Sequence, residues 1–226
     1  MPTPMPTLLH LDSSASPADR SVSRRLTARF ARAWQAGHPG AGYRYRDLAA
    51  DPVPLIGAGY ASLGVRVERH GAPVPLADVP AFAATPDEHH EWSLTHPLIT
   101  ELHAADTLLL GVPMYNFTVP AALKAWIDRV TFPGAHTGRL TATRVIAVTA
   151  RGGGYGPGTP REPFDFQTPY LRAWCTEHLG VPEANLRFVH AELTRAADVP
   201  ALTPYRGLAT TSLTTARTTL TTLATA

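Results

Sequence analysis

The sequence predicts a single α/β domain, in which a doubly wound, five-stranded parallel sheet of strand order 2-1-3-4-5 has helices on both faces. Short apolar runs alternate with segments of helical periodicity along the whole chain. The apolar runs are continuous rather than interrupted by polar residues, as is typical of strands buried on both faces. At 226 residues the chain can bury one core without a linker, so we expect one domain over residues 1–226.

The first half of the chain predicts two strands and one helix. The apolar run at residues 7–12 predicts the first strand. Apolar residues at helical spacing predict a helix over 21–36, and Gly37 is expected to end it in the C′ position. The segment 43–48 predicts a second strand. Residues 49–84 are rich in Pro, Gly and Ala, and we expect an irregular excursion there.

The second half begins with a strong helix start. Thr85 can cap the helix with its hydroxyl, the proline after it suits the first helical position, and the Asp and Glu that follow suit the first turn. We expect this helix to run to about Ala105. A last helix is predicted from the apolar face of Leu213, Ala216, Leu220 and Leu223. Between these two helices we expect strands at 107–112, 144–150 and 186–191, and helices at about 120–130 and 168–179.

Several classes of protein and site are disfavoured by composition. The net charge of +2, without a basic stripe on any one segment, argues against a nucleic-acid partner. No apolar run reaches the length of a membrane span, and the first residues do not resemble a signal peptide, so we expect a cytoplasmic protein with no membrane partner. The single cysteine, Cys175, is expected to be a packing residue. His89, His96 and His103 recur two helical turns apart, which suits a solvated helix face and not a metal site.

Three loops should meet beyond the carboxyl ends of the strands, where parallel sheets bind their ligands. The first loop, 13–21, precedes a helix and has neither a dinucleotide fingerprint nor an NTPase loop. Its hydroxyls and the helix N-terminus could bind a phosphate, and the alternative is a serine-rich turn in which Ser21 caps the helix. The hydroxyls belong to Ser13, Ser14, Ser16, Ser21 and Ser23.

The other two loops add an aromatic and a glycine-rich surface. The loop 113–120 carries an amide side chain among large apolar ones, and the loop 151–166 begins with Arg151 and successive glycines, whose backbone can approach a ligand closely. Together the three loops suit a ligand with a phosphate tail and a flat ring with a polar edge. Flavin mononucleotide (FMN) has that shape. No G-x-S-x-G motif supports a hydrolase.

These segments also resemble a known family. The chain is similar to the FMN-dependent azoreductases and NAD(P)H:quinone oxidoreductases, which have a flavodoxin-like fold. The resemblance extends over nearly the whole chain and is carried by LDSSASPADRSVSRRL, RDLAADPVP, PMYNFTVPAALKAWIDRV, AVTARGGGY and DFQTPYLRAW.

The resemblance implies which residues bind FMN, and it implies no catalytic residue and no metal. The phosphate would be bound by Ser14, Ser21, Val22 and Ser23. The isoalloxazine ring would be bound by Met114, Tyr115, Asn116 and Phe117. The pyrimidine edge of the ring would be bound by Ala150, Arg151, Gly152 and Gly153, with Tyr155 close by. The family usually has a hydroxyl residue in place of Ala150, so one side-chain hydrogen bond is expected to be absent.

The resemblance further implies a reaction. NADH or NADPH would reduce the bound FMN and leave, and a quinone, azo or nitro compound would then take two electrons. We expect the glycine-loop amides and Arg151 to stabilise the negative charge of the reduced flavin. The segment 134–143 is shorter than in relatives, where it borders the substrate pocket, so a specialised biosynthetic flavin reductase stays open as a variant.

Two further questions stay open from the sequence. Family members are homodimers, and Trp126 could be a dimer contact or a core residue. A flavodoxin-type electron carrier is the alternative class, although flavodoxins are typically short and acidic and this chain has a pI of about 8.9.

Overall fold

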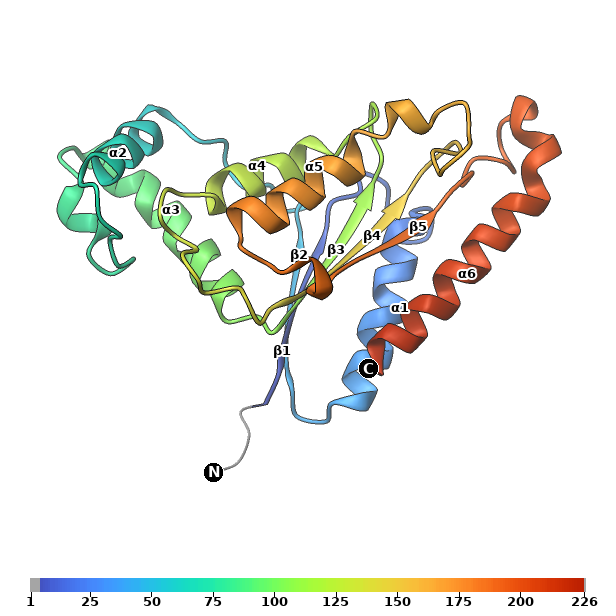
Figure 1. Cartoon of the computed structure of the whole chain (residues 1–226), viewed down its shortest axis with the longest axis horizontal. Coiled ribbons are helices and arrows are strands. Elements are labelled where there is room, and N and C mark those ends of the chain that lie inside the picture. Colours follow the sequence, from blue (N-terminus) through green and yellow to red (C-terminus); the bar gives the residue numbers. More distant parts are fainter. Residues whose placement is uncertain (1–4, 226) are drawn as a thin grey trace.

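The computed structural model describes residues 5–225 and contains the expected parallel sheet (Figure 1). The strand order is β2-β1-β3-β4-β5, which confirms the 2-1-3-4-5 prediction. The strands are β1 (Thr7–Asp12), β2 (Gly42–Asp47), β3 (Thr107–Pro113), β4 (Arg144–Ala150) and β5 (Leu186–Ala191).

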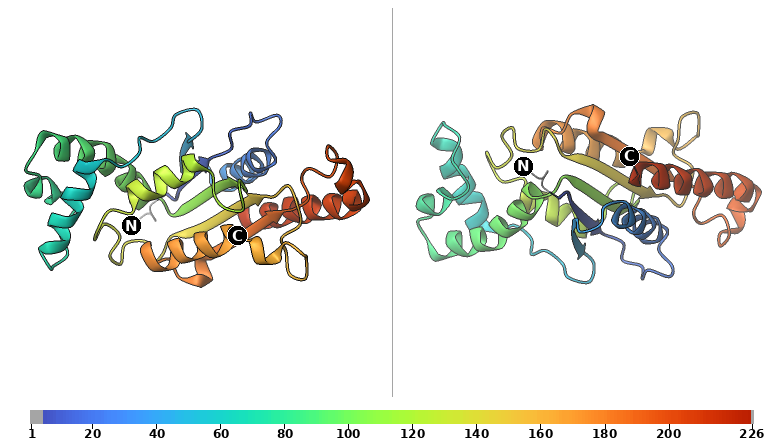
Figure 2. Two further views of the ribbon diagram at one scale, coloured as in Figure 1. Left: turned by 90° about the horizontal axis from the view of Figure 1, so that it is seen from above. Right: turned by 90° about the horizontal axis from the view of Figure 1, so that it is seen from below.

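Within the described residues, six α-helices accompany this sheet. α1 and α6 cover one face and pack against each other, whereas α3, α4 and α5 belong to the other side (Figures 1 and 2). α2 packs on α3 and lies farthest from the sheet (Figure 1). The helices are α1 (Val22–Gly37), α2 (Ala58–Arg69), α3 (Pro86–His103), α4 (Ala121–Val130), α5 (Gln167–Ala173) and α6 (Arg206–Ala224).

Each face of the sheet has its own apolar core. Successive strand residues point to opposite faces, so Leu8 belongs to one core and Leu9 to the other. The core under α1 and α6 includes Phe30 and Leu220, and the larger core includes residues of α2, α3, α4 and α5. This two-sided burial explains the continuously apolar runs of β1, β3 and β4.

The edge strand β2 does not follow that pattern. Half of its residues are exposed and the other half are partly buried, and its side chains make polar contacts on both faces. Tyr43 and Tyr45 contact side chains of β1, and Arg46 pairs with Glu101 of α3. β2 is therefore attached through hydrogen bonds and ion pairs more than through apolar packing.

The prediction of an irregular segment over 49–84 was wrong, because this segment contains α2 and a short 3-10 helix at Val79–Phe82. Tyr60, Leu63 and Val67 have helical spacing and are buried, so packing outweighs the low helix propensity of the glycines. Gly59 is needed at the contact with α3, since a Cβ there would overlap the Asp87 carboxylate.

Smaller differences concern helix ends. Gly37 lies inside α1, and the glycine with left-handed backbone is Gly40, with φ of +82°. Thr85 caps α3, as expected, and Glu88 completes a capping box with it. The helix expected at 168–179 is α5 followed by a π-helical turn over Trp174–His178.

Buried side chains answer three sequence-based expectations. Cys175 is fully buried, which confirms a packing role, and burial raises the pKa of its thiol to about 12. Trp126 is also fully buried and packs edge-on against Trp174, so it is a core residue of this chain. His103 does not lie on a solvated face, because its Nε2 is 3.0 Å from Nδ1 of the largely buried His136.

Within residues 5–225 no helix has the length and apolar character that crossing a membrane requires.

Candidate functional site

A crevice of about 740 Å³ lies beyond the carboxyl ends of β1, β3 and β4. Its size is that of a pocket for a cofactor-sized molecule. The three predicted loops line it together with a fourth segment after β5. From the predicted set, the lining residues are Ser14, Ser21, Val22, Ser23, Met114, Tyr115, Asn116, Phe117, Ala150, Gly152, Gly153 and Tyr155.

Backbone and side-chain hydrogen bonds join the three loops to one another. The N–H of Ala15 donates to the Tyr115 hydroxyl at 3.1 Å, which connects the first loop to the second. The N–H of Met114 donates to the Ala150 carbonyl at 2.8 Å, which connects the second loop to the third. The crevice is therefore a fixed arrangement of loops rather than three independent segments.

The second loop contains a tight turn with unusual backbone geometry. Asn116 and Phe117 both have positive φ, +47° and +70°, between Tyr115 and Thr118, which exchange two backbone hydrogen bonds. Asn tolerates the left-handed region, but a bulky residue such as Phe is strained there. Backbone strain of this kind is concentrated at functional sites, and here it places the Phe117 ring at the crevice with 41% of its surface exposed.

The serine loop, residues 13–21, caps α1 and also contributes residues to the crevice. Ser21 caps α1 by accepting the N–H of Arg24 at 3.3 Å. Its Oγ is also 3.2 Å from Ser23 Oγ, and Ser14 Oγ accepts the N–H of Ser16 at 3.2 Å. Since Ser14, Ser21 and Ser23 all line the crevice, helix capping does not remove them from the site.

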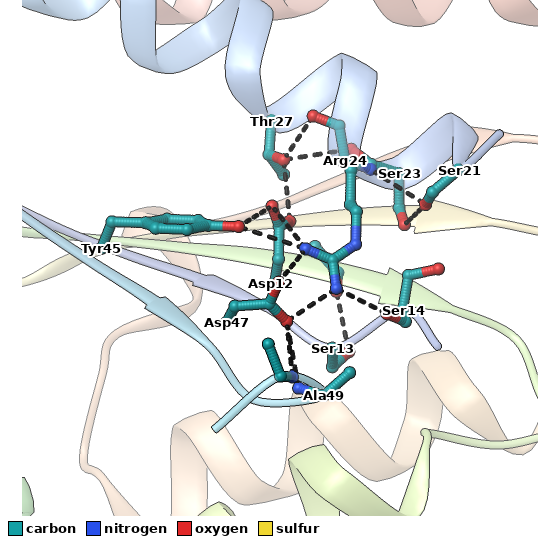
Figure 3. Close-up of polar contacts among 12 residues, drawn as sticks. Asp12, Ser13, Ser14, Ser21, Ser23, Arg24, Thr27, Tyr45, Asp47 and Ala49 are labelled. Carbon is teal, nitrogen blue, oxygen red and sulfur yellow. Dashed lines mark hydrogen bonds and ion pairs between the residues drawn. The ribbon is translucent and has the colours of Figure 1, made fainter. Parts of the chain in front are cut away.

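A buried polar network lies directly behind this serine loop (Figure 3). Arg24 forms a bidentate ion pair with Asp47, with distances of 2.6 and 2.7 Å, and its Nη2 also donates to the Ser14 carbonyl at 2.6 Å. The hydrogen bond from Arg24 holds the pKa of Asp47 below its ordinary value. The network thus joins the serine loop to α1 and to the end of β2.

The same network includes a buried carboxylate on β1. Asp12 accepts hydrogen bonds from Thr27 at 2.9 Å and from the Tyr45 hydroxyl at 3.1 Å. Burial, followed by the nearby Asp12 charge, raises the pKa of Tyr45, so this hydroxyl keeps its proton. Gly111 of the neighbouring strand lies against Asp12, and a Cβ at Gly111 would overlap Asp12 Oδ1.

The structure places Arg151 differently from the expectation that its charge faces a flavin. Arg151 does not line the crevice and is only 1% exposed. Its guanidinium pairs with Asp165 at 3.0 Å and Glu192 at 3.3 Å and donates to Thr168 at 2.5 Å. Two carboxylates therefore balance its charge, and these contacts connect the start of the glycine loop to its end, to α5 and to the segment after β5.

Gln167 supports the aromatic loop in a similar way. It is fully buried, and its Nε2 donates to the carbonyls of Pro113 at 3.2 Å and Thr118 at 3.4 Å. No sequence pattern indicates this role, because a glutamine at the start of a helix has many uses.

Sequence reasoning missed the positively charged lining of the crevice. Arg20, Arg161 and Arg195 line it, and Asp198 is the one carboxylate among its lining residues in the described chain. The segment after β5 was overlooked, although its strand also ends at this edge of the sheet. It contributes Thr194, Arg195, Asp198, Val199, Ala201 and Leu202.

Comparisons with known proteins agree with this architecture. A sequence model described as the flavodoxin-like fold matches residues 6–202, which confirms the expected fold class. An azoreductase from Bacillus anthracis has the same fold, with a TM-score of 0.80, 19% identity, and coverage of 98% of this chain and 99% of that chain.

Closer similarity is found in sequence. An FMN-dependent NADH:quinone oxidoreductase from Nocardia farcinica is 47% identical over 202 residues, which cover 89% of this chain and 90% of that protein. A protein of the same name from Streptomyces coelicolor is 44% identical over 206 residues, which cover 88% of this chain and 84% of that protein. The chain therefore belongs to the family of flavodoxin-like quinone oxidoreductases that these relatives represent.

Proposed function

We propose that this protein is an FMN-dependent enzyme that transfers two electrons from NADH or NADPH to a quinone, azo or nitro acceptor. The observation that carries the proposal is the crevice itself, which joins a hydroxyl-rich helix N-terminus to an aromatic turn and a glycine loop. The names of the relatives, which specify FMN, NADH and quinone, support the same function.

The donors around the crevice fit FMN at both ends. The phosphate would be bound by the hydroxyls of Ser14, Ser21 and Ser23 and by the first-turn N–H groups of α1, which include that of Val22. Arg20, next to Ser21, would supply positive charge. The ring would lie against Met114, Tyr115, Asn116 and Phe117, with Ala150, Gly152, Gly153 and Tyr155 at its polar edge.

FMN supplies the hydride and electron chemistry when bound, and the protein supplies binding, orientation and electrostatics. Negative charge at the polar edge of the ring is best stabilised by fixed N–H dipoles in a site with little water. We assign this role to the backbone amides of Gly152 and Gly153. Arg151 would hold these amides in place, because its own charge is balanced by Asp165 and Glu192.

The mouth of the crevice suits a flat acceptor. The Phe117 ring lies near Tyr155 and Phe164, with centroid distances of 6.3 and 5.6 Å. Phe117 and Phe164 are both partly exposed, so an aromatic acceptor such as a quinone could stack on them. Among the described residues that line the crevice, none belongs to the shortened segment 134–143.

We further propose a homodimer and a cytoplasmic location, where NADH and NADPH are available. A second hollow, of about 620 Å³ and mainly apolar, lies on the outer sides of α2, α4 and α5. Ile56 and Val65 line it and are 42% and 43% exposed, which suits a contact between two copies. Size-exclusion chromatography with light scattering would measure the oligomeric state, and a monomer at micromolar concentration would contradict the dimer.

The enzyme and carrier classes differ in one experiment. The purified protein is titrated with FMN, mixed with NADH or NADPH in a stopped-flow instrument, and then exposed to a quinone or an azo dye. The enzyme is expected to bind FMN, bleach rapidly with at least one nicotinamide donor and regain its colour with the acceptor. Failure to bind FMN would contradict the proposal, and FMN binding without reduction by either donor would favour an electron carrier.

A further inference from the structure

We propose that Arg24 is a phosphate-binding residue, whose Nε–H donates a hydrogen bond to the phosphate of FMN while its two Nη atoms hold the serine loop. The inference rests on the proposed function, since it requires FMN in the crevice. It adds to the serine site a buried arginine that does not itself line the crevice.

The first observation is an unused donor. Arg24 is only 7% exposed, and Nη1 and Nη2 donate to Asp47, to the Tyr45 hydroxyl and to the Ser14 carbonyl. The Nε–H has no hydrogen-bond partner among residues 5–225. Buried N–H groups without an acceptor are rare in folded proteins, and a charged one calls for a physical explanation.

The second observation is the direction of that donor. Arginine presents its five N–H groups in a rigid planar fork. Asp47 occupies the end of the fork, where it accepts one N–H from each Nη. The other N–H of Nη2 points to the Ser14 carbonyl, and in a planar guanidinium the Nε–H is parallel to it. The unused donor is therefore directed to the side of Ser14.

Figure 3 shows what lies on that side. The Arg24 side chain descends from α1 with Asp12, Tyr45 and Asp47 on one side and the serines on the other. Ser14, Ser21 and Ser23 all line the crevice. An acceptor placed among these hydroxyls would complete the hydrogen bonding of Arg24, and a phosphate ester offers several acceptor oxygens with negative charge.

The third observation is that Arg24 is held in place without a ligand. Asp47, which fixes the end of the fork, accepts the N–H groups of Ala49 and Ala50 at 3.1 and 3.2 Å. Tyr45, which accepts from Nη1, is itself bonded to Asp12. A donor fixed in this way loses little freedom on binding, which favours affinity for the phosphate.

The direct consequence is selectivity for the phosphorylated flavin. Riboflavin has the same ring as FMN but no phosphate, so it cannot use Arg24. Replacing Arg24 should weaken FMN by about 10- to 100-fold, the usual range for a lost charge-assisted hydrogen bond, and riboflavin by less than about threefold.

The test uses flavin fluorescence titrations of the full chain with FMN and with riboflavin. The variants are Arg24→Lys, which keeps a positive charge but loses the fork, and Arg24→Met. The matched control is Arg29→Met, an exposed arginine on the same helix. We expect a selective loss of FMN in both Arg24 variants and none in the control. Equal losses of the two flavins would overturn the inference, whereas a wild-type protein that binds neither flavin would contradict the proposed function instead.

A second readout separates a direct hydrogen bond from loop support, because it is made on the wild-type protein and uses variants only to assign one signal. NMR spectra of the arginine Nε–H groups of the wild-type protein are recorded with FMN and with riboflavin, the Arg24 signal being assigned by its absence in Arg24→Lys. If that variant does not fold, an Asp47→Asn spectrum assigns the signal by its shift. We expect the Arg24 signal to move on addition of FMN and to stay in place with riboflavin. A signal that responds equally to both flavins, or to neither, would overturn the inference.

Discussion

Two buried arginines show how differently this fold uses the same side chain. Arg129, fully buried between α3 and α4, donates through Nη1 to Glu91 at 2.7 Å, through Nε to the Pro54 carbonyl at 3.0 Å and through Nη2 to the Leu55 carbonyl at 2.8 Å. Arg24 also pairs with a carboxylate, but its Nε–H has no acceptor within the described chain. The arginine whose nitrogens are all bonded has no part in the lining of the crevice, and the one with a spare donor lies behind the serine loop.

The contrast distinguishes a structural ion pair from one that can also bind a ligand. Arg129 connects the segment before α2 to α3 and α4 through its hydrogen bonds, and each of its three nitrogens already donates to a protein acceptor. Arg151, behind the glycine loop, resembles Arg24 in this respect, because its Nε also lacks a partner among residues 5–225. Unsatisfied buried donors thus occur next to both ends of the crevice.

The largest expected effect is on stability, from Arg129→Met. This change leaves the Glu91 carboxylate buried without its partner, which typically costs about 3–5 kcal/mol of the free energy of unfolding. Urea denaturation measures the loss, and flavin titration of the folded protein should show an unchanged ratio of FMN to riboflavin affinity. If this variant selectively lost FMN, the distinction between the two arginines would fail.

Gly111→Ala should have the next largest effect. The new methyl group would overlap Asp12 Oδ1 and lie 3.1 Å from Thr27 Cγ2, behind the serine loop. Overpacking of this kind costs about 1–3 kcal/mol, and the displaced Asp12 should also weaken FMN binding. The matched control is Gly207→Ala in α6, where a Cβ meets no atom within 4 Å in the described structure. Gly111→Ala with control-like stability would mean that Asp12 is not rigidly held.

A smaller effect is expected from acidification, through the buried histidine pair. Burial lowers the pKa of His103 from 6.5 to about 4 and also lowers the pKa of His136. The unfolded chain therefore binds protons more readily than the folded chain. The free energy of unfolding should be highest above pH 6.5 and should fall as the pH drops from 6.5 towards 4. His190, whose pKa is also lowered to about 4, adds to the same trend.

Urea denaturation at several pH values measures this dependence, and His103→Asn should make it shallower. Neither histidine lines the crevice or belongs to the polar network around Arg24, so the selectivity for FMN should not change in the variant. An equally steep pH dependence in His103→Asn would show that other groups carry it.

The smallest effect on stability is expected at the strained turn. Phe117→Gly relieves a φ of +70° and should change the free energy of unfolding by no more than about 1 kcal/mol. Loss of the ring should weaken FMN and riboflavin to the same extent, because both have the isoalloxazine. This result would separate the ring end of the crevice from the phosphate end, where Arg24→Lys should affect FMN alone. A loss confined to FMN would contradict the assignment of the two ends.

The parts predicted from the sequence were those with a local cause. Apolar runs predicted four of the strands in the described chain, and the alternating segment 43–48 predicted the edge strand β2. The serine, aromatic and glycine loops were found because the strand order brings their ends together. α2 was missed because its glycines outweighed the periodicity of Tyr60, Leu63 and Val67. The role of Arg24 depends on Asp47 and Ser14, which lie 23 and 10 residues away in sequence, so no local pattern shows it.

The burial of Arg151 was missed for the same reason. Its partner Asp165 lies at the far end of the 151–166 loop, and its partner Glu192 follows β5 directly, so neither is near it in sequence. A charged residue beside glycines at a strand end predicted contact with the ligand. In the structure this charge is instead buried and paired with two carboxylates.

A crystal structure of the FMN complex tests the central claim most directly, through the distance from Arg24 Nε to the phosphate. We predict a phosphate oxygen about 2.7–3.2 Å from this nitrogen, the ordinary range for an N–H···O hydrogen bond, with the Asp47 ion pair retained. A phosphate bound among the serines with Arg24 Nε still lacking an acceptor would contradict the role of Arg24, and a flavin bound outside this crevice would contradict the whole account.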